Sequence, residues 1–306
     1  MIPLLVIEGP TASGKSDLAI TLAEILGTEI ISADSRQVYR YLNIGTAKPS
    51  QEELQRVKHH LIDIVDPDQS YNSGLFVRDT EHIIDDLTMK GKIPIICGGT
   101  GLYVKSLLHG LFELPEIDPQ IRTTLKRRLD SVTIDQLYKE LHTCDPVFAS
   151  GISVNDTQRI LRGLEVFMAT GKNISDHWKE QATKSKYTPY RILMDIPRDI
   201  LYSRINHRLG KMIASGLLQE ISDLFTRGFT HSDPGLNSLG YKEFMPYFSG
   251  IDTLESCLDK AKQYSRNYAK RQCTWYRKYD FNLTITNPDY NISEIRSPIL
   301  HWAQSV

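Results

Sequence analysis

The chain has 306 residues, of which 41% are hydrophobic and 24% are charged, and its formal net charge at pH 7 is −1. A chain of this length forms about two domains, and the composition is that of an ordinary soluble globular protein. No apolar run approaches the roughly 18 residues that cross a bilayer, and the N-terminal apolar run carries no cleavage-site pattern. We therefore expect a cytoplasmic protein without a membrane span.

The first predicted strand is the apolar run 4–8, and a glycine-rich loop follows it directly. This loop fits the phosphate-loop pattern GxxxxGK[ST], and its residues are Gly9, Pro10, Thr11, Ala12, Ser13, Gly14, Lys15 and Ser16. The glycines let successive N–H groups point into one concavity, where the helix predicted for 17–26 begins. Lys15 adds a positive charge, and Ser16 offers a hydroxyl to a Mg²⁺ ion. The loop predicts a polyphosphate site without naming the compound.

Further strands are predicted at 29–33, 93–97, 191–196 and 282–286, with helical stretches between the first several of them. Strands that alternate with helices predict an α/β fold with a doubly wound parallel sheet. Three of the strands end in polar or glycine-rich turns, namely the phosphate loop, 34–37 and 98–101. Because ligands bind at the carboxyl ends of such strands, we expect these three turns to converge.

The strand pattern disappears from about residue 111 to residue 190, and helical periodicity replaces it. Ile121, Leu125 and Leu129 lie four residues apart, and Asp156 is placed to cap a helix that runs to Gly171. We therefore predict a phosphate-loop core formed by residues 1–111 and 186–306, and a helical insertion domain formed by residues 112–185.

Asp34 follows the second predicted strand and lies beside the phosphate loop. Its carboxylate has three possible roles: it holds Mg²⁺ through water, it acts as a general base, or it caps the next turn. Arg204 and Arg208 are four residues apart on a predicted helix, so they share a face. They either clamp a diphosphate or form surface ion pairs with Asp199 or Glu220.

The segment between Lys260 and Lys278 contains seven Lys or Arg residues and no acidic residue. On a helix, one face carries Lys262, Arg266, Lys270 and Arg277, and the opposite side carries Tyr264, Tyr268, Trp275 and Tyr279. Two interpretations remain open for this helix. It is a surface helix docked by its aromatic side chains, or it contacts the phosphates of a nucleic acid.

Cysteines do not define a site. Cys97, Cys144, Cys257 and Cys273 are scattered, without a CxxC pair or a histidine at zinc spacing. Neither a disulfide framework nor a zinc site is predicted, and we expect reduced, buried thiols.

An ordered series of motifs resembles the tRNA dimethylallyltransferases, also called tRNA isopentenyltransferases, of the bacterial type. The matching stretches are GPTASGKS at 9–16, ISADSRQVY at 31–39, IGTAKP at 44–49, HHLIDI at 59–64, GGTGLY at 98–103, NDTQRI at 155–160, RGLEVF at 162–167 and LGYKE at 239–243. The resemblance covers most of the chain. It implies that the phosphate loop binds dimethylallyl diphosphate, with Mg²⁺ as cofactor, and that the dimethylallyl group is transferred to the exocyclic amine of the adenosine 3′-adjacent to the anticodon.

The resemblance also implies roles for individual residues. Asp34 would accept the proton of the adenine amine, Thr11 would contact the bridging region of the diphosphate, and Arg204 would grip its far end, with Arg208 as a further diphosphate contact. The implied tRNA contacts are Asp34, Ser35, Arg36, Gln37, Thr100, Arg122, Asn155, Asp156, Thr157, Gln158, Arg159, Ser238, Leu239, Gly240, Tyr241, Lys242 and Glu243. The implied partner is the anticodon stem-loop of tRNA, which the insertion domain helps to hold, and we expect a monomer.

Two other classes share the phosphate loop. A small-molecule or nucleotide kinase would also use the aspartate and the arginine pair, but it would not need the insertion or the basic helix. A nucleic-acid-binding NTPase would place an acidic residue after a neighbouring strand, where this chain has Gly98 and Gly99.

Overall fold

The computed structural model describes residues 1–110, 117–180 and 185–306. The chain forms two compact units, of which the first comprises Met1–Leu108 and Ser185–Val306, and the second comprises His109–Lys184. Each unit has its own hydrophobic core.

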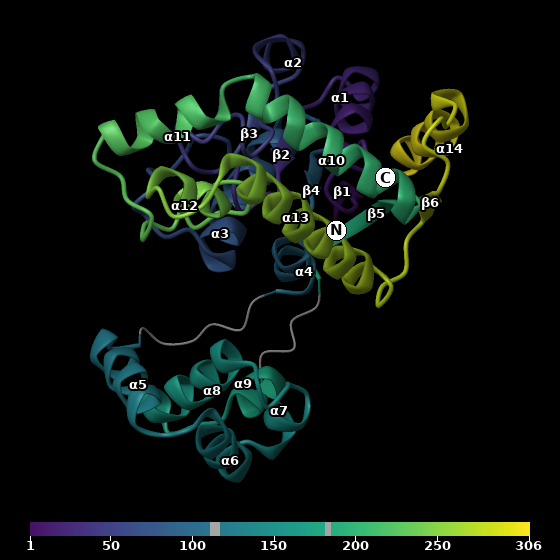
Figure 1. Ribbon diagram of the computed structural model, residues 1–306. Coiled ribbons are helices and arrows are strands. Elements are labelled where there is room, and N and C mark those ends of the chain that lie inside the picture. The colour runs from purple at the N-terminus through teal and green to yellow at the C-terminus, as the bar shows by residue number, and fades with distance from the viewer. Residues whose placement is uncertain (111–116, 181–184) are drawn as a thin grey trace. The chain divides into compact units, whose positions relative to one another are not determined.

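The first unit is built on a six-stranded parallel sheet of order β3-β2-β4-β1-β5-β6 (Figure 1). Its strands are β1 (Ile2–Glu8), β2 (Ile30–Ser32), β3 (His59–His60), β4 (Ile95–Gly98), β5 (Tyr187–Met194) and β6 (Leu283–Ile285). Neighbouring strands that are far apart in sequence require crossover connections, so the order is that of a doubly wound α/β fold. The predicted fold class is confirmed.

Helices cover both faces of this sheet. They are α1 (Lys15–Leu26), α2 (Gln51–Arg56), α3 (Ser73–Met89), α4 (Gly101–His109), α10 (Arg198–Ala214), α11 (Leu217–Thr226), α12 (Met245–Phe248), α13 (Leu254–Tyr276) and α14 (Ile292–Ser305), with the 3₁₀ helix η1 (Lys242–Phe244). Leu5 and Ile7 of β1 pack in one core with α1 and α14, whereas Leu4 and Val6 pack in another with α3 and α4. Successive strand side chains point to opposite faces, which accounts for this alternation.

A third core lies under the loop that follows β2. Val38 and Leu42 of this loop pack with Ile205 and Leu209 of α10 and with residues of α11 and α13. Helices α10 and α13 also pack against each other (Figure 1). This core fixes the loop beside the carboxyl ends of the strands.

Two details of the sheet differ from the sequence-based prediction. Strand β3 was not predicted, because it has only two residues and both are histidines. Strand β5 begins at Tyr187 rather than at Arg191 and includes Pro189. Strand β6 pairs with β5 only from Ile192 onward. The backbone of Pro189 on the β6 side therefore has no neighbouring strand to bond, and the missing N–H of proline costs no hydrogen bond.

The second unit is helical throughout its regular elements. They are α5 (Pro119–Ser131), α6 (Ile134–Cys144), α7 (Pro146–Ser150), α8 (Thr157–Thr170) and α9 (Ile174–Glu180). Asp156 caps α8 and Gly171 ends it, as predicted, and Leu125 is buried in the core while Ile121 and Leu129 pack against it.

All four cysteines are free. Cys97, Cys257 and Cys273 are buried as expected, but Cys144 is only half-buried because it ends α6. In the described ranges, no helix is long and apolar enough to cross a membrane.

An ion-pair cluster at Glu29 ties the edge of the sheet together. Its carboxylate is 2.7 Å from His60 Nε2, 2.8 Å from Lys92 Nζ and 3.4 Å from Lys58 Nζ. Burial acts to raise the pKa of Glu29, but hydrogen bonds from Lys92, His60 and Lys58 outweigh it and lower the pKa from 4.5 to about 2.

Glu29→Gln should therefore destabilise the protein at pH 7 by on the order of 2 kcal/mol. Because folding lowers the pKa of Glu29, its ionised carboxylate stabilises the folded state at pH values above the unfolded pKa of 4.5. This contribution is lost as the pH falls from 4.5 toward 2. Urea unfolding of Glu29→Gln and of the exposed control Glu52→Gln, at pH 7 and pH 3, checks this. A constant difference between Glu29→Gln and wild type across that range would contradict it.

Candidate functional site

The phosphate loop joins β1 to α1 and turns through two residues in the left-handed region. Ala12 has φ 66° and Gly14, which precedes α1, has φ 91°. Gly9 allows a close approach, since a Cβ atom there would lie 2.9 Å from the Cβ atom of Met194. Such a backbone presents consecutive N–H groups to an anion at a helix N-terminus.

Several donors in and beside this loop lack acceptors. Ser13 Oγ and Arg208 Nε are buried and have no hydrogen-bond partner within the described parts of the chain. Among the described residues, Lys15 Nζ donates only to Pro10 O, at 3.3 Å, and burial lowers the pKa of Lys15. Ser16 lies exposed in the first turn of α1. Because unpaired buried polar groups are costly, a bound anion would compensate for them.

The two predicted arginines both reach the phosphate loop from α10. Arg208 Nη2 donates to Thr11 Oγ1 at 2.5 Å, and Arg204 Nη1 approaches Ser13 O at 3.5 Å. Burial lowers the pKa of Arg208. Neither guanidinium forms an ion pair with a described residue, so the alternative of a surface ion pair is not realised.

Asp34 follows β2 and uses one carboxylate oxygen to cap a turn. Its Oδ1 accepts hydrogen bonds from the N–H groups of Arg36, at 2.8 Å, and Gln37, at 3.4 Å. Its Oδ2 has no partner among the residues that the structure describes. The turn cap and a chemical role are therefore compatible, because they use different oxygens.

The turns after β1, β2 and β4 converge, as predicted. Ser35 N donates to Thr100 Oγ1 at 3.0 Å. A Cβ atom on Gly98 would lie 2.1 Å from Ala33 O, so glycine is needed for this close approach. The turn after β4 thus serves packing, and it carries no carboxylate of the kind that an NTPase uses there.

Helix α13 joins the phosphate loop to the turn after β4. Gln272 Oε1 accepts the N–H of Thr11 at 2.9 Å, and Gln272 Nε2 donates to Gly99 O at 2.8 Å. Tyr276 OH donates to Gly9 O at 3.4 Å. The buried side of the predicted basic helix is therefore part of the site.

The faces of α13 differ in part from the prediction. The buried side chains are mostly small, and they are Cys257, Ala261, Ser265, Ala269, Gln272, Cys273 and Tyr276. Tyr264, assigned to a docked aromatic face, is 47% exposed. Tyr264, Tyr268 and Trp275 lie on one side of the helix, but the buried face is centred on the neighbouring small residues, which allow the closer approach to α10.

The basic residues of α13 fall into two groups. Lys262 Nζ bonds to Asp259 at 3.0 Å and Arg266 Nη1 to Asn206 at 2.7 Å. Lys270 and Arg271 are exposed, and they line a hollow of about 370 Å³ together with Asn267 and Thr274. Lys270 and Arg271 are thus the better-placed cations for an external anion.

The predicted RNA contacts in the first unit differ in accessibility. The side chain of Gln37 is used internally, since Ser32 Oγ donates to its Oε1 at 3.0 Å and its Nε2 donates to Ala47 O at 3.0 Å. Arg36 is half-buried, and its Nη1 donates to Pro234 O at 3.4 Å.

The segment 238–243 is largely buried. The side chains of Ser238, Tyr241 and Glu243 are at most 5% exposed, whereas Lys242 is exposed. Gly240 is buried and Leu239 is half-buried. Any contact of this segment with a macromolecule therefore falls mainly to Lys242.

The remaining predicted contacts lie in the second unit, apart from Thr100. Asn155, Gln158 and Arg159 are exposed, and Asp156 and Thr157 begin α8. Arg122 is also exposed, and its Nε bonds to Glu165 at 2.8 Å.

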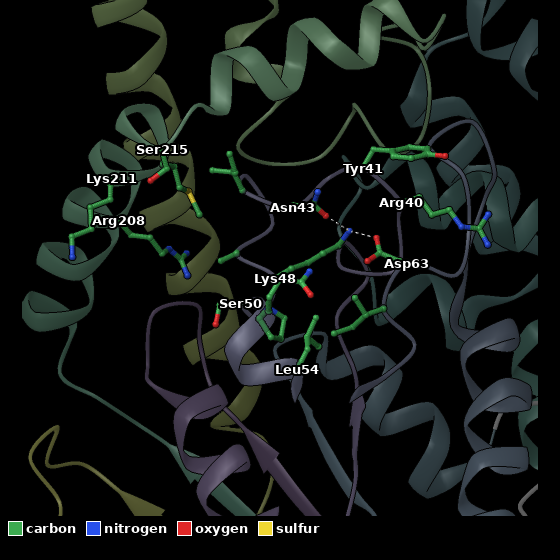
Figure 2. Close-up of a pocket in the computed structure, with 16 residues that line it drawn as sticks. Arg40, Tyr41, Asn43, Lys48, Ser50, Leu54, Asp63, Arg208, Lys211 and Ser215 are labelled. Atoms are coloured by element: carbon green, nitrogen blue, oxygen red, sulfur yellow. Dashed lines mark hydrogen bonds and ion pairs between the residues drawn. The ribbon is translucent and has the colours of Figure 1, made fainter. Parts of the chain in front are cut away.

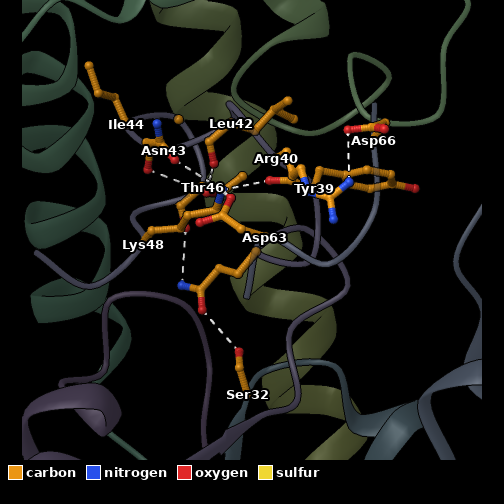
Figure 3. A network of polar contacts seen from close by, with 12 residues as sticks. Ser32, Tyr39, Arg40, Leu42, Asn43, Ile44, Thr46, Lys48, Asp63 and Asp66 are labelled. Atoms are coloured by element: carbon orange, nitrogen blue, oxygen red, sulfur yellow. Dashed lines mark hydrogen bonds and ion pairs between the residues drawn. The ribbon is translucent and has the colours of Figure 1, made fainter. Parts of the chain in front are cut away.

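Arg208 also lines a cavity of about 760 Å³ (Figure 2). The cavity has charged side chains and an apolar wall, and it is lined by Arg40, Tyr41, Asn43, Ile44, Ala47, Lys48, Pro49, Ser50, Gln51, Leu54, Ile62, Asp63, Arg208, Lys211, Met212 and Ser215. Lys48, which is 5% exposed, donates to Tyr39 O at 2.6 Å and to Asn43 Oδ1 at 3.1 Å, and it pairs with Asp63 (Figure 3).

The sequence model of the family described as IPP transferase matches residues 37–279. The chain belongs to the IPP transferase family. It is 42% identical over 279 residues to tRNA dimethylallyltransferase 1 of Syntrophotalea carbinolica, covering 90% of this chain and 88% of that protein. It is 40% identical over 306 residues to the tRNA dimethylallyltransferase of Thermoanaerobacter sp. strain X514, covering 98% of this chain and 97% of that one.

Solved structures agree with this assignment to the IPP transferase family. The fold matches the crystal structure of a eukaryotic dimethylallyltransferase acting on tRNA with a TM-score of 0.83 and 31% identity. That match covers 98% of this chain and 79% of the other. The predicted resemblance is confirmed at the level of family and fold.

Sequence reasoning missed three residues of this IPP transferase that shape the site. Gln272 is an uncharged residue and Tyr276 an aromatic residue inside a helix. Their hydrogen-bond partners lie more than 170 residues away in the sequence. Glu220 was considered only as an ion-pair partner, but it binds backbone N–H groups of residues 43–45. No local sequence pattern identifies such long-range contacts.

Proposed function

We propose that this protein transfers the dimethylallyl group of dimethylallyl diphosphate to the exocyclic amine of the adenosine 3′-adjacent to the anticodon of tRNA. The observation that carries the proposal is the placement of Asp34 beside a phosphate loop whose buried donors, Ser13 Oγ and Arg208 Nε, lack partners in the described structure. An anion site and a carboxylate oxygen with no hydrogen-bond partner are the two elements that this substitution reaction needs.

The reaction forms one carbon–nitrogen bond and breaks one carbon–oxygen bond. The amine nitrogen attacks the allylic carbon, and the diphosphate leaves with the electron pair of the broken bond. Thr11, Lys15, Arg204 and Arg208 would stabilise the negative charge that grows on the leaving group. Asp34 Oδ2 would take the proton from the nitrogen as the new bond forms, while Oδ1 keeps its turn contact with Arg36.

Ser16 fits as a protein ligand for Mg²⁺. Magnesium usually keeps several waters and binds one or two protein oxygens together with substrate phosphates. Ser16, exposed next to Lys15, suits this pattern, and within residues 1–110, 117–180 and 185–306 no cluster of three or more acidic, histidine or cysteine side chains would hold a metal without the substrate. Bound there, Mg²⁺ would neutralise charge on the diphosphate.

For the RNA, we propose that the anticodon stem-loop contacts both units. In the first unit the accessible candidates are Asp34, Ser35, Arg36, Thr100 and Lys242. In the helical unit they are Arg122, Asn155, Gln158 and Arg159, with Asp156 and Thr157 shaping the start of α8. An unpaired loop base leaves its stack at small energetic cost, which suits a target adenine that must reach Asp34.

A donor assay tests the proposal against the kinase alternative. Purified protein is offered either dimethylallyl diphosphate or ATP, each with and without tRNA, and the release of diphosphate and the transfer of phosphate are measured. We expect diphosphate release only with dimethylallyl diphosphate and tRNA together. Phosphate transfer from ATP to a small acceptor would contradict the prenyltransferase assignment and support the kinase assignment.

We expect the exposed cations of α13 to contribute to RNA binding. The double variant Lys270→Gln and Arg271→Gln should bind tRNA more weakly. The slope of log Kd for tRNA against log salt concentration should fall by just under one unit for each RNA phosphate that is no longer neutralised. Titrations at several salt concentrations measure this slope, with Lys262→Gln as a control because Lys262 is already paired with Asp259. An unchanged slope in the double variant would show that the exposed cations of α13 do not contact RNA.

A further inference from the structure

The loop 43–48 forms a wall of the cavity beside Arg208. Ile44 and Ala47 of this loop face the cavity with Met212 of α10, and Arg208 links the cavity to the phosphate loop through Thr11. A diphosphate held at the phosphate loop would therefore share Arg208 with this cavity, which offers Ile44, Ala47 and Met212 to a hydrocarbon group.

This wall has an unusual backbone. Ala47 has φ 50°, and the neighbouring segments contain Tyr41 with φ 67° and Asp63 with φ 57°. Residues other than glycine adopt this region at a cost, and they keep it only where surrounding contacts hold them. Backbone hydrogen bonds from Ala47 N–H to Ile44 O, at 3.0 Å, and from Lys48 N–H to Asn43 O, at 3.1 Å, close the loop from within, and contacts from other elements also hold it.

Glu220 of α11 supplies much of this constraint. Its Oε2 accepts the N–H groups of Asn43 and Ile44, both at 2.9 Å, and its Oε1 lies 3.3 Å from the N–H of Gly45. One carboxylate thus binds three consecutive backbone N–H groups, which are charge-assisted hydrogen bonds and stronger than neutral ones.

Tyr241 completes the contact. Its hydroxyl donates to Glu220 Oε1 at 2.6 Å, and its side chain is fully buried. A Cβ atom on Gly45 would lie 2.4 Å from the Tyr241 ring, so the ring packs directly on the loop backbone. Tyr241 therefore holds both the carboxylate and the loop.

We propose that Glu220 and Tyr241 are positioning residues that set the wall 43–48 of the allylic diphosphate site, so that they govern use of the hydrocarbon part of the donor. This assigns Tyr241 an internal role in place of an RNA contact. The inference rests on the proposed prenyl transfer, because it requires a donor with a hydrocarbon group.

Two variants and a control test this role. Glu220→Gln keeps the size of the side chain but replaces one acceptor oxygen by a donor that faces backbone N–H groups, and Tyr241→Phe removes only the hydroxyl. Asp223→Asn is the control, because Asp223 is an exposed carboxylate on the same helix that bonds to Gln219. For each protein, KM and kcat for dimethylallyl diphosphate, the Kd for tRNA and the inhibition constant of inorganic diphosphate are measured.

We expect Glu220→Gln to raise KM for dimethylallyl diphosphate about tenfold, and Tyr241→Phe to raise it about threefold. The Kd for tRNA and the inhibition constant of inorganic diphosphate, which has no hydrocarbon, should stay at the wild-type values. Asp223→Asn should behave as wild type. If Glu220→Gln does not fold, Tyr241→Phe, which keeps the ring, decides the matter.

An unchanged KM in folded variants would overturn the inference. A parallel rise in the inhibition constant of inorganic diphosphate would also overturn it, since the damage would then reach the phosphate loop. Wild-type protein that does not use dimethylallyl diphosphate would overturn the proposed function together with this inference, whereas active wild type with unaffected variants would overturn only the inference.

Discussion

Asp34→Asn should lower the rate of prenyl transfer by about 10²–10⁴-fold, the range expected when a general base is removed. Asparagine keeps an Oδ1 acceptor for the N–H of Arg36, which lies 2.8 Å from the aspartate oxygen, so the turn is preserved. It replaces the other oxygen, Oδ2, with a group that cannot take a proton. Single-turnover rates with saturating tRNA and dimethylallyl diphosphate isolate this effect.

Binding measurements separate the chemical role of Asp34 from the turn. Because asparagine keeps the size of the side chain and can still hydrogen-bond to RNA, Asp34→Asn should bind tRNA and inorganic diphosphate about as tightly as wild type. Asp34→Ala should show the same fall in rate and also some loss of tRNA affinity and of stability. Asp68→Asn, at an exposed aspartate outside the site, is the control. Wild-type turnover in Asp34→Asn would reduce Asp34 to a turn cap.

Lys15→Met should reduce kcat/KM for dimethylallyl diphosphate by on the order of 10²–10³-fold. Lys15 is held in the phosphate loop, where burial lowers its pKa and no carboxylate of the described residues is bonded to its ammonium group. A bound diphosphate would supply the missing negative charge in the ground state, and more of it as the carbon–oxygen bond breaks. Both KM and kcat should therefore change.

The Kd for tRNA should not change in Lys15→Met, because the proposed RNA contacts are at other residues. Lys105→Met, at an exposed lysine of α4, controls for the loss of one positive charge. A Lys15→Met protein with wild-type kcat/KM would show that the phosphate loop does not hold the donor.

The parts of the site that could be predicted are those with a local pattern. The phosphate loop follows β1 directly, Asp34 follows β2, and in a parallel sheet the carboxyl ends of strands lie along one edge. The spacing of Arg204 and Arg208 likewise placed both on one helix face. Short-range rules of backbone and helix geometry were enough for these residues.

The parts that could not be predicted depend on contacts between distant segments. Gln272 bridges Thr11 and Gly99 through a buried amide, and Glu220 binds the turn 43–45 across more than 170 residues. The exposure of Tyr264 and the burial of small residues such as Ala261 on α13 were also not predicted, because small residues leave no strong periodic signal. These contacts are set by how helices pack on the sheet, which the local sequence does not encode.

The most direct measurement is the position of the transferred group in the RNA. An anticodon stem-loop is incubated with dimethylallyl diphosphate labelled in its hydrocarbon part, then digested to nucleosides and compared with a stem-loop in which the adenosine 3′-adjacent to the anticodon is replaced by a purine nucleoside without the exocyclic amine. We expect the label on that adenosine alone, and no label in the substituted RNA. Equal labelling of both RNAs, or no labelling of the natural one, would contradict prenyl transfer to this amine.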